Sequence, residues 1–468
     1  MANRLRTLLA SMTERRILLW IILVGVGLRL VAAFILGNSV VELPGIQDQI
    51  SYDSLARRVV GGFGFSFGTD WWPVTRAGEP TAHWSFLYTL YLAGVYLLTG
   101  EQVIVARVLQ AIVAGVLTPI LTWRVARQVL PSRGALAAAG LSAVYGYFIY
   151  YAGALMTESF YILAILWSLD LALRLGAPSG TATSNWRRWA LLGFSLGVVA
   201  LMRQVFLLFV PVLCAWLLWA AVRAHGMPGA RRTVVGLMLA GCVTFAMILP
   251  WTVRNYQVFH HVVFLNTNAG YAFFWGNHPI HGTNFISILP TETYRALIPQ
   301  ELRPLNEAEI DSALMSRGIG FVLQDPGRYV LLSISRIRDY FMFWPSTDSG
   351  ALSNVVRVLS YGLYLPLMLY GIWKVAAGAT VARLNDDRRR GWILLGLFLV
   401  VYTGVHLLTW TLVRYRLPVD AVAMPLAGLA VLDLFGRFVP TRAPASESRA
   451  ARTGWLAPPV QTTESGRP

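Results

Sequence analysis

The chain has 468 residues, of which 56% are hydrophobic and 13% are charged, and its formal net charge is +16. Soluble domains have roughly 45–50% apolar and about 25% charged residues, so this composition and a mean hydropathy of +0.55 exclude an ordinary soluble protein. The basic residues lie in many short segments rather than on one arm or face. The positive charge therefore gives no indication of a nucleic-acid partner.

Apolar runs close to the roughly 20 residues that a helix needs to cross a bilayer recur along the chain. They predict about ten membrane-spanning helices, in the range of about 8–12, at 17–37, 103–123, 134–152, 157–175, 188–202, 205–223, 233–252, 355–377, 391–410 and 417–435. The runs lack the ten-residue alternation of a transmembrane β-barrel. The expected fold is an all-α polytopic membrane protein of the cell membrane.

Arginine-rich segments alternate with the predicted spans. They precede the first span and recur at 124–133, 224–232 and 378–390, and the positive-inside rule assigns them to the cytoplasm. Residues 38–102 and 253–354 then form two large loops on the outer face, and both termini are cytoplasmic. The first apolar run follows a basic segment, as in a signal peptide, but it is long and lacks a clear cleavage site, so we expect it to remain a helix.

One apolar segment, 84–98, is short and rich in Trp and Tyr. Counting it as a span would invert every basic segment that follows, so we expect it at the outer interface or partly inserted. Residues 1–437 then form one transmembrane domain. Residues 438–468 are rich in Pro, Ser, Thr and Arg, and they predict a disordered cytoplasmic tail.

The first outer loop carries an acidic motif, Asp48-x-x-x-Tyr52. A carboxylate at the membrane edge usually has a function, and here it suggests an enzyme whose substrate is carried in the bilayer. Asp48 could instead cap the helix that contains Tyr52, because Asp is favoured at helix N-caps. Asp53 and Asp70 in the same loop are expected to be solvated charges.

A reaction that displaces a phosphate needs fewer catalytic groups than one that displaces an alcohol. Glycosidases use two carboxylates, but a phosphate leaves as a stable anion, so one carboxylate base and a cationic clamp suffice. Lys374 is the only lysine, so a phosphate would be bound by arginine, whose planar fork suits phosphate oxygens. The expected groups are Asp48 and the outer-face residues Arg254, Arg414 and Arg416.

Two of these arginines, Arg414 and Arg416, lie in a short outer turn against the positive-inside bias, and phosphate binding would explain them. Arg203 follows the fifth predicted span at the same face, and it is a further candidate for binding phosphate. Glu158 opens the fourth span at its outer end, where a carboxylate also interacts favourably with the helix dipole.

Arg254 and Asn255 end a span at the outer boundary, where they could bind phosphate, order a loop or, for the arginine, simply snorkel. Four histidines, His260, His261, His278 and His281, lack the spacing and the carboxylate partner of a zinc site. We therefore predict no cofactor. A divalent metal is compatible with the chemistry but has no support in the sequence.

Short motifs along the chain resemble family 39 glycosyltransferases of the GT-C superfamily, whose members include bacterial aminoarabinose transferases and protein O-mannosyltransferases. After the Asp48 motif, they are Pro80-Thr81-Ala82, Met156-Thr157-Glu158, Leu201-Met202-Arg203, Pro250-Trp251-Thr252-Val253-Arg254-Asn255, Asn268-Ala269-Gly270, Trp275-Gly276-Asn277, Asp325-Pro326 and Arg414-Tyr415-Arg416-Leu417-Pro418. Their order and their placement on one side of the membrane carry the resemblance. Asp325-Pro326 also predicts a helix start, and 328–344 an amphipathic helix at the outer interface.

The resemblance implies inverting transfer of a sugar from a polyprenyl-phosphate donor to a lipid, glycan or protein acceptor at the outer face. It assigns Asp48 as the catalytic base. Glu158 faces the same surface as Asp48, and a carboxylate at the membrane edge usually has a function, so we expect it either to act as a second catalytic-site carboxylate or to have a structural role. The implied substrate-binding residues are Tyr52, His83, Arg203, Arg254, Asn255, Arg414 and Arg416.

The sequence departs from the family at Ala82-His83-Trp84, where relatives often carry Pro and Tyr, sometimes with Lys or Arg; His83 is expected to replace part of that cation. The alternative function is a transporter or a lipid-linked sugar flippase. Transporters tend to show repeated halves, and this sequence has no internal repeat.

Overall fold

The computed structural model describes residues 13–43, 45–177, 185–346, 350–377 and 386–438. These residues contain no β-strand, only two isolated bridges, Ser66 with Pro80 and Trp71 with Thr75. The all-α prediction is therefore confirmed. All but the first residue of the predicted cytoplasmic tail, and residues 378–385 of one predicted cytoplasmic loop, lie outside the described residues.

Helices account for most of the described chain. In order they are α2 (Glu14–Leu36), α3 (Asp48–Val60), α4 (Phe86–Thr99), α5 (Val103–Val129), α6 (Ser132–Val144), α7 (Gly146–Gly153), α8 (Glu158–Leu175), α9 (Trp186–Met202), η1 (Gln204–Leu208), α10 (Val210–Phe259), α11 (Ala269–Asn277), η2 (Pro279–His281), α12 (Thr291–Leu297), η3 (Gln300–Leu302), α13 (Glu307–Gln324), α14 (Pro326–Tyr340), α15 (Ala351–Arg357), η4 (Val358–Gly362), α16 (Leu363–Ala376), α17 (Asp386–Leu408), η6 (Val413–Arg416) and α18 (Leu417–Phe438).

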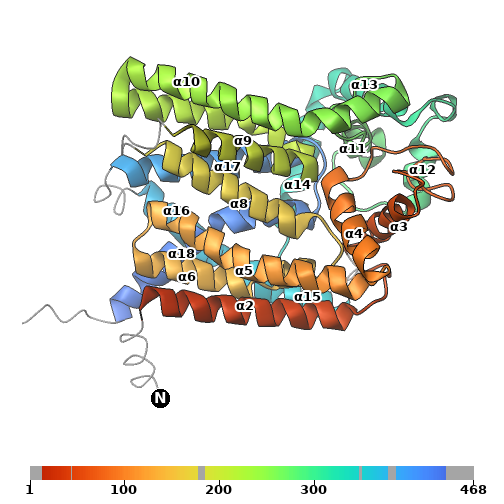
Figure 1. The fold of residues 1–468 in the computed structure, drawn as a ribbon. Helices are drawn as coiled ribbons and strands as arrows, with labels where there is room; N and C mark the ends of the chain where they lie inside the picture. The colour runs from red at the N-terminus through yellow and green to blue at the C-terminus, as the bar shows by residue number, and fades with distance from the viewer. Residues whose placement is uncertain (1–12, 44, 178–184, 347–349, 378–385, 439–468) are drawn as a thin grey trace, which may run out of the picture.

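Each predicted span falls in one helix or in consecutive helical segments. The runs 205–223 and 233–252 share α10, which Gly226 divides with a non-helical φ of 63° and ψ of −156°. Glycine adopts such a conformation without the steric cost that a Cβ would add. The chain turns back at that residue, and the two halves of α10 lie side by side (Figure 1). The run 134–152 forms α6 and α7, which meet at a bend of 49°.

Six described helices are long and apolar enough to cross a membrane, or seven if α6 and α7 form one bent span. That count takes α10 as one helix although it holds two predicted runs. It leaves out α9, which has 17 residues, because it includes only helices of at least 18. α8 carries three charges, Glu158, Asp170 and Arg174, in its 18 residues. The chain is therefore a multi-pass membrane protein, and ten spans stay a prediction.

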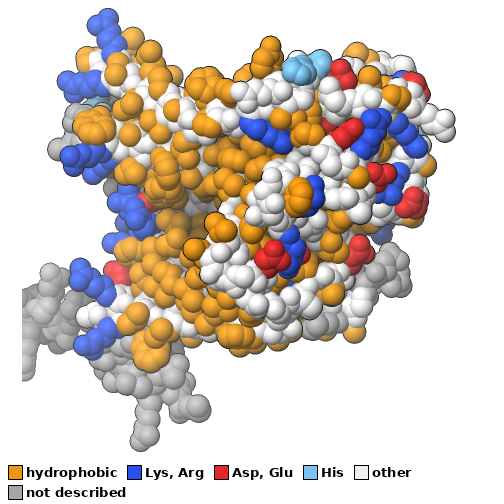
Figure 2. All heavy atoms as spheres, turned by 45° about the vertical axis from the view of Figure 1, so that its right-hand side comes forward, with side chains coloured by type: hydrophobic (Ala, Val, Ile, Leu, Met, Phe, Trp, Pro, Cys, Tyr) orange, Lys and Arg blue, Asp and Glu red, His pale blue; other side chains and the backbone are white. Residues whose placement is uncertain are grey.

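The two large predicted outer loops meet at one end of the long helices (Figure 1). α3 packs on α4 from the first loop, and α11 packs on α13 from the second. α4 holds most of the segment 84–98 and lies at this loop end, where it contacts α5 and α9. Lys and Arg side chains gather at the opposite end of the helices, whereas acidic and basic side chains are mixed over the loop end (Figure 2).

The second loop also contains the predicted helix start. Asp325 accepts a hydrogen bond from the Arg328 amide at 2.9 Å, and Pro326 is the first residue of α14. The helix α14 covers most of the predicted amphipathic segment, with Leu332, Arg336 and Tyr340 buried on one face. The expectation of a helix start at Asp325-Pro326 is thus met.

We predict that the loop end faces outside and the arginine-rich end faces the cytoplasm. Ala77 lies in the first outer loop, and Arg187 lies in the first turn of α9, at the end away from the cavity; both are exposed. In a variant without Cys214 and Cys242, each can be replaced by cysteine. A membrane-impermeant maleimide should label Ala77→Cys in intact cells and Arg187→Cys only after permeabilisation. The reverse pattern would contradict this topology.

Candidate active site

A cavity of about 2440 Å³ lies at the loop end of the bundle. It is bordered by the ends of α2 and α7, by the first outer loop, by α11 to α13 and by the segment before α18. Five residues predicted for the site line it: Asp48, Tyr52, His83, Arg203 and Arg414. Four lie outside its lining: Glu158, Arg254, Asn255 and Arg416.

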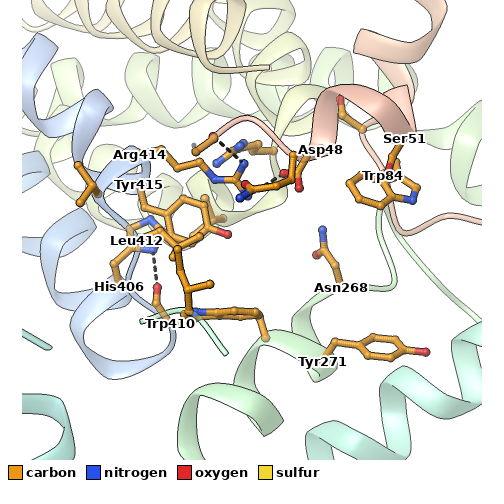
Figure 3. A pocket seen from close by; sticks show the side chains of 18 of the residues that line it. Asp48, Ser51, Trp84, Asn268, Tyr271, His406, Trp410, Leu412, Arg414 and Tyr415 are labelled. Atoms are coloured by element: carbon orange, nitrogen blue, oxygen red, sulfur yellow. Dashed lines mark hydrogen bonds and ion pairs between the residues drawn. The ribbon is translucent and has the colours of Figure 1, made fainter. Parts of the chain in front are cut away.

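Asp48 forms an ion pair with Arg414. The Asp48 Oδ2 atom lies 2.7 Å from Arg414 Nη2, and the two side chains meet at the cavity (Figure 3). Asp48 is the first residue of α3, Gln47 holds the N-cap position, and no side chain caps this helix. The capping alternative for Asp48 therefore has no support. The Asp48 side chain is 25% exposed, so its carboxylate remains open to a ligand in the cavity.

Glu158 lies close to both Arg203 and Arg414 but does not line the cavity. Its Oε1 atom lies 2.6 Å from Arg203 Nη2 and 4.0 Å from Arg414 Nε. Arg203 Nε also donates to Thr157 Oγ1 at 2.8 Å. Glu158 is 1% exposed, and a carboxylate buried this deeply requires such cationic partners. Its contacts orient Arg203 and Arg414, and it does not reach the cavity itself.

Four charged side chains thus alternate in sign: Asp48, Arg414, Glu158 and Arg203. The Arg414 side chain lines the cavity and is 11% exposed, so part of it is open to a phosphate there. A phosphate bound to Arg414 would lie next to Asp48, which brings a base and a leaving-group site to the same guanidinium.

Tyr52 and His83 are both buried at the edge of the cavity. The Tyr52 ring packs edge-on against Trp84 and Tyr88, and burial raises the pKa of its hydroxyl. Burial also lowers the pKa of His83, and its Nδ1 atom lies 3.1 Å from the carbonyl oxygen of Thr267. His83 lines the cavity, and its role in place of a cation stays a prediction.

Arg254 and Asn255 order the outer loops. Arg254 Nη1 donates to the Thr81 carbonyl at 3.0 Å. Asn255 Nδ2 donates to the carbonyls of Val263 and Leu265 at 3.1 and 3.0 Å. Of the roles considered for this pair, loop ordering is the one that these contacts support, and we leave both residues out of the proposed substrate contacts.

The structure does not bring Arg416 to the cavity. Its side chain is fully buried, with Nε 3.1 Å from Asp420 Oδ1 and Nη1 donating to the Tyr340 carbonyl at 2.6 Å. Its guanidinium carbon lies 3.3 Å from the ring centre of Tyr361. The buried pair with Asp420 explains why this arginine stands in the outer turn, so the expected phosphate contact is withdrawn.

Replacing Arg416 with alanine should destabilise the protein rather than weaken donor binding. The change leaves Asp420 buried without its cation, which typically costs about 3–5 kcal/mol. Thermal unfolding in detergent should show a large fall in the midpoint temperature, while donor affinity in the folded fraction stays unchanged. An Arg416→Ala protein of normal stability that binds donor poorly would return this residue to the site.

Asp53 and Asp70, two acidic residues of the first loop, differ in their contacts and exposure. Asp53, expected to be solvated, pairs with Arg57 at 2.9 Å and accepts a hydrogen bond from the Tyr96 hydroxyl at 2.5 Å. This correction follows from the packing of α3 on α4, which brings Tyr96 to Asp53. Asp70 is exposed, as expected, and accepts from the Ala77 amide at 2.9 Å.

Glu307 is a structural centre of the site that the sequence analysis missed. Its carboxylate accepts hydrogen bonds from the hydroxyls of Thr75 and Thr81 at 3.0 and 2.7 Å and from the Ala82 amide at 2.8 Å. The Thr267 hydroxyl donates to it as well. Glu307 thereby joins the two outer loops beside His83. The spacing gave no signal, because its partners lie far away in the sequence.

Across the described ranges, no group of three or more His, Cys, Asp or Glu side chains is placed to hold a metal ion. His261 Nε2 lies 3.2 Å from Glu309 Oε1, and His281 Nε2 lies 2.8 Å from the Trp275 carbonyl oxygen. These two histidines therefore have structural partners in the outer loops.

Comparison with known proteins links the chain to membrane glycosyltransferases. The family model described as dolichyl-phosphate-mannose-protein mannosyltransferase matches residues 83–253. The archaeal oligosaccharyltransferase AglB from Archaeoglobus fulgidus, in complex with an inhibitory peptide and a dolichol-phosphate, has a TM-score of 0.57 at 17% identity, over 94% of this chain and 53% of that chain. An Archaeoglobus fulgidus oligosaccharyltransferase in the apo form has a TM-score of 0.58 at 16% identity, over 92% of this chain and 51% of that chain. ArnT from Cupriavidus metallidurans in the apo state has a TM-score of 0.40 at 15% identity, over 88% of this chain and 74% of that chain.

No curated protein sequence matches the chain. The chain spans about half the length of the oligosaccharyltransferase chains, and at these identities the likeness shows a shared fold. The segment matched by the family model begins at His83 and includes Glu158 and Arg203. The matched segment is thus similar to part of a mannosyltransferase family, and the fold is similar to that of the oligosaccharyltransferases.

Proposed function

We propose that the protein transfers a sugar from a polyprenyl-phosphate donor to an acceptor at the outer face of the cell membrane, with inversion at the anomeric carbon. The observation that carries this proposal is the Asp48–Arg414 pair in the cavity, where a base adjoins a cation for phosphate. The AglB complex with dolichol-phosphate supports a lipid phosphate as part of the donor. We assign the activity to residues 1–437.

In the proposed reaction, the donor phosphate binds Arg414 and Arg203, whose planar guanidinium groups match phosphate oxygens. Asp48 removes the proton of the acceptor hydroxyl as that oxygen attacks the anomeric carbon. The bond between the anomeric carbon and the phosphate oxygen breaks, and its electron pair stays on the phosphate, beside the two arginines. Attack opposite the leaving group inverts the configuration, and the departing phosphate needs no acid.

The cavity also offers a path for the prenyl chain of the donor. Its lining includes Ala32 and Ile35 of α2, Ile149 of α7, Met342, which follows α14, and Val356 of α15. Ile35 is 79% exposed at the end of α2, where bilayer lipid would meet it. An amphipathic donor could therefore keep its chain in the bilayer while its phosphate enters the cavity.

A transport assay separates this function from the flippase alternative. The purified protein is reconstituted in liposomes and incubated with polyprenyl-phosphate sugars that carry a labelled sugar ring. A cell-envelope extract is added as a source of acceptors. We expect the label to leave the lipid fraction and to enter a new product. Passage of the intact sugar lipid across the bilayer, with no product, would support the flippase and contradict the transferase.

A further inference from the structure

One side of the cavity is an aromatic wall. It consists of Trp72 and Trp84 from the first outer loop, Tyr271 and Trp275 from α11, Tyr294 from α12, and Trp410, which follows α17. The Trp72 and Trp275 rings stack with centroids 5.3 Å apart, and Trp410 lies 5.7 Å from Trp275. Four segments that are distant in the sequence thus form one continuous surface. Trp72 and Trp410 are only half-buried, so they present free ring area to a ligand.

Among the described residues, the arginines that line the cavity are Arg203, Arg338, Arg357 and Arg414, and none of them belongs to α11, α12 or α13. Among the described lining residues of α11, α12 and α13, only Asp311 is charged. Its carboxylate accepts hydrogen bonds from the amides of Gly270 and Tyr271 at 2.8 and 3.3 Å, and burial raises its pKa to about 7. A phosphate or carboxylate on a ligand would meet no cation from these three helices.

An uncharged polar side chain adjoins the wall. Asn268 lies near Trp84 and Tyr271 at the cavity (Figure 3). Its Nδ2 atom donates to the His83 carbonyl at 3.2 Å, and its Oδ1 atom accepts from Gln204 Nε2 at 2.8 Å. An amide can exchange hydrogen bonds with ligand hydroxyl groups and brings no charge to them.

Asp48 lies between Arg414 on one side and Trp84 on the other (Figure 3). In an inverting displacement, the acceptor hydroxyl approaches the anomeric carbon from the face opposite the leaving phosphate. With the phosphate at Arg414, the acceptor must therefore come from the side of the aromatic wall, where Asp48 can take its proton.

From this arrangement, and resting on the proposed function, we infer that the acceptor is an uncharged saccharide whose rings lie along the aromatic wall. The faces of aromatic rings carry partial negative charge, and the C–H groups of a sugar ring pack against them favourably. The wall offers this packing surface, and the described lining residues of α11, α12 and α13 place no cation beside it. An acceptor that carries phosphate or carboxylate groups would lose its hydration there without gaining a partner.

Calorimetric titration of the purified protein in nanodiscs, without donor, tests this inference. The probes are uncharged glucan, mannan, galactan and arabinan oligosaccharides, an oligogalacturonate, and a Ser/Thr-rich peptide. We expect saturable binding of at least one uncharged oligosaccharide and about tenfold weaker binding after Trp72→Ala or Trp410→Ala. Trp72→Phe, which keeps a ring face, should restore most of the affinity. Trp20→Ala, at a 60% exposed position of α2 that does not line the cavity, is the matched control.

Tighter binding of the peptide or the oligogalacturonate than of every uncharged probe would overturn the inference. So would the absence of saturable binding by all uncharged probes, or unchanged affinity in Trp72→Ala. Donor binding keeps this test separate from the proposed function. If Arg414→Ala binds a polyprenyl-phosphate sugar normally while Trp72→Ala loses the saccharide, the donor site is wrong and the saccharide site stands.

Discussion

Replacing Asp48 with asparagine should stop sugar transfer without unfolding the protein. Asparagine has nearly the same size and can still accept a hydrogen bond from Arg414, but it cannot take a proton from the acceptor. Loss of a general base lowers a rate by roughly 10²–10⁴-fold. The turnover of a labelled polyprenyl-phosphate sugar measures this effect, and the thermal unfolding midpoint verifies that the fold is intact.

Asp70→Asn is the matched control for that experiment. Asp70 lies in the same loop and is exposed, and its contact with the Ala77 amide survives the change. Asp53→Asn is a poorer control, because Asp53 pairs with Arg57 and holds the Tyr96 hydroxyl. Near-normal turnover in Asp48→Asn would show that another group is the base.

Replacing Arg414 with alanine should mainly weaken donor binding. A charge-assisted hydrogen bond contributes about 1.5–3 kcal/mol, so the donor affinity should fall by roughly ten- to a hundredfold. Arg414→Lys should recover only part of this loss, because an ammonium group lacks the planar fork that contacts both a phosphate and Asp48. Equilibrium binding of a non-hydrolysable polyprenyl-phosphonate sugar gives the affinities.

Arg416→Ala serves as the comparison, since Arg416 is two residues away and does not line the cavity. The two variants should separate: the first binds donor weakly at near-normal stability, and the second is unstable with normal donor affinity. Equal donor affinity in the wild type and Arg414→Ala would remove this arginine from the phosphate site.

Several site residues could be predicted from the sequence because each stands against its local background. Asp48 is an acidic residue beside the first apolar run, and Arg414 is a cation in a turn where the charge bias disfavours one. Arg203 follows a span at the same face. The structure brings all three side chains to one cavity, although Arg203 and Arg414 are separated by about half of the sequence.

The remaining site residues could not be predicted because their roles depend on contacts between distant segments. Arg414 and Arg416 look alike in the sequence, and only packing shows that Arg416 faces Asp420 one helical turn later while Arg414 faces the cavity. Glu307 bonds to Thr75 across 232 positions. The aromatic wall likewise joins rings from four separate segments, each of which alone resembles a membrane-interface belt.

The most direct test of the proposed chemistry is to measure both products made by the purified protein. A donor with a labelled sugar is incubated with an acceptor, and mass spectrometry quantifies the polyprenyl phosphate that is released and the sugar that is transferred. NMR spectroscopy then gives the anomeric configuration of the product. We predict equal amounts of the two products, an inverted anomeric centre, and neither product with Asp48→Asn. Retained configuration, or release of polyprenyl phosphate that is unchanged in Asp48→Asn, would contradict single-step transfer with Asp48 as the base.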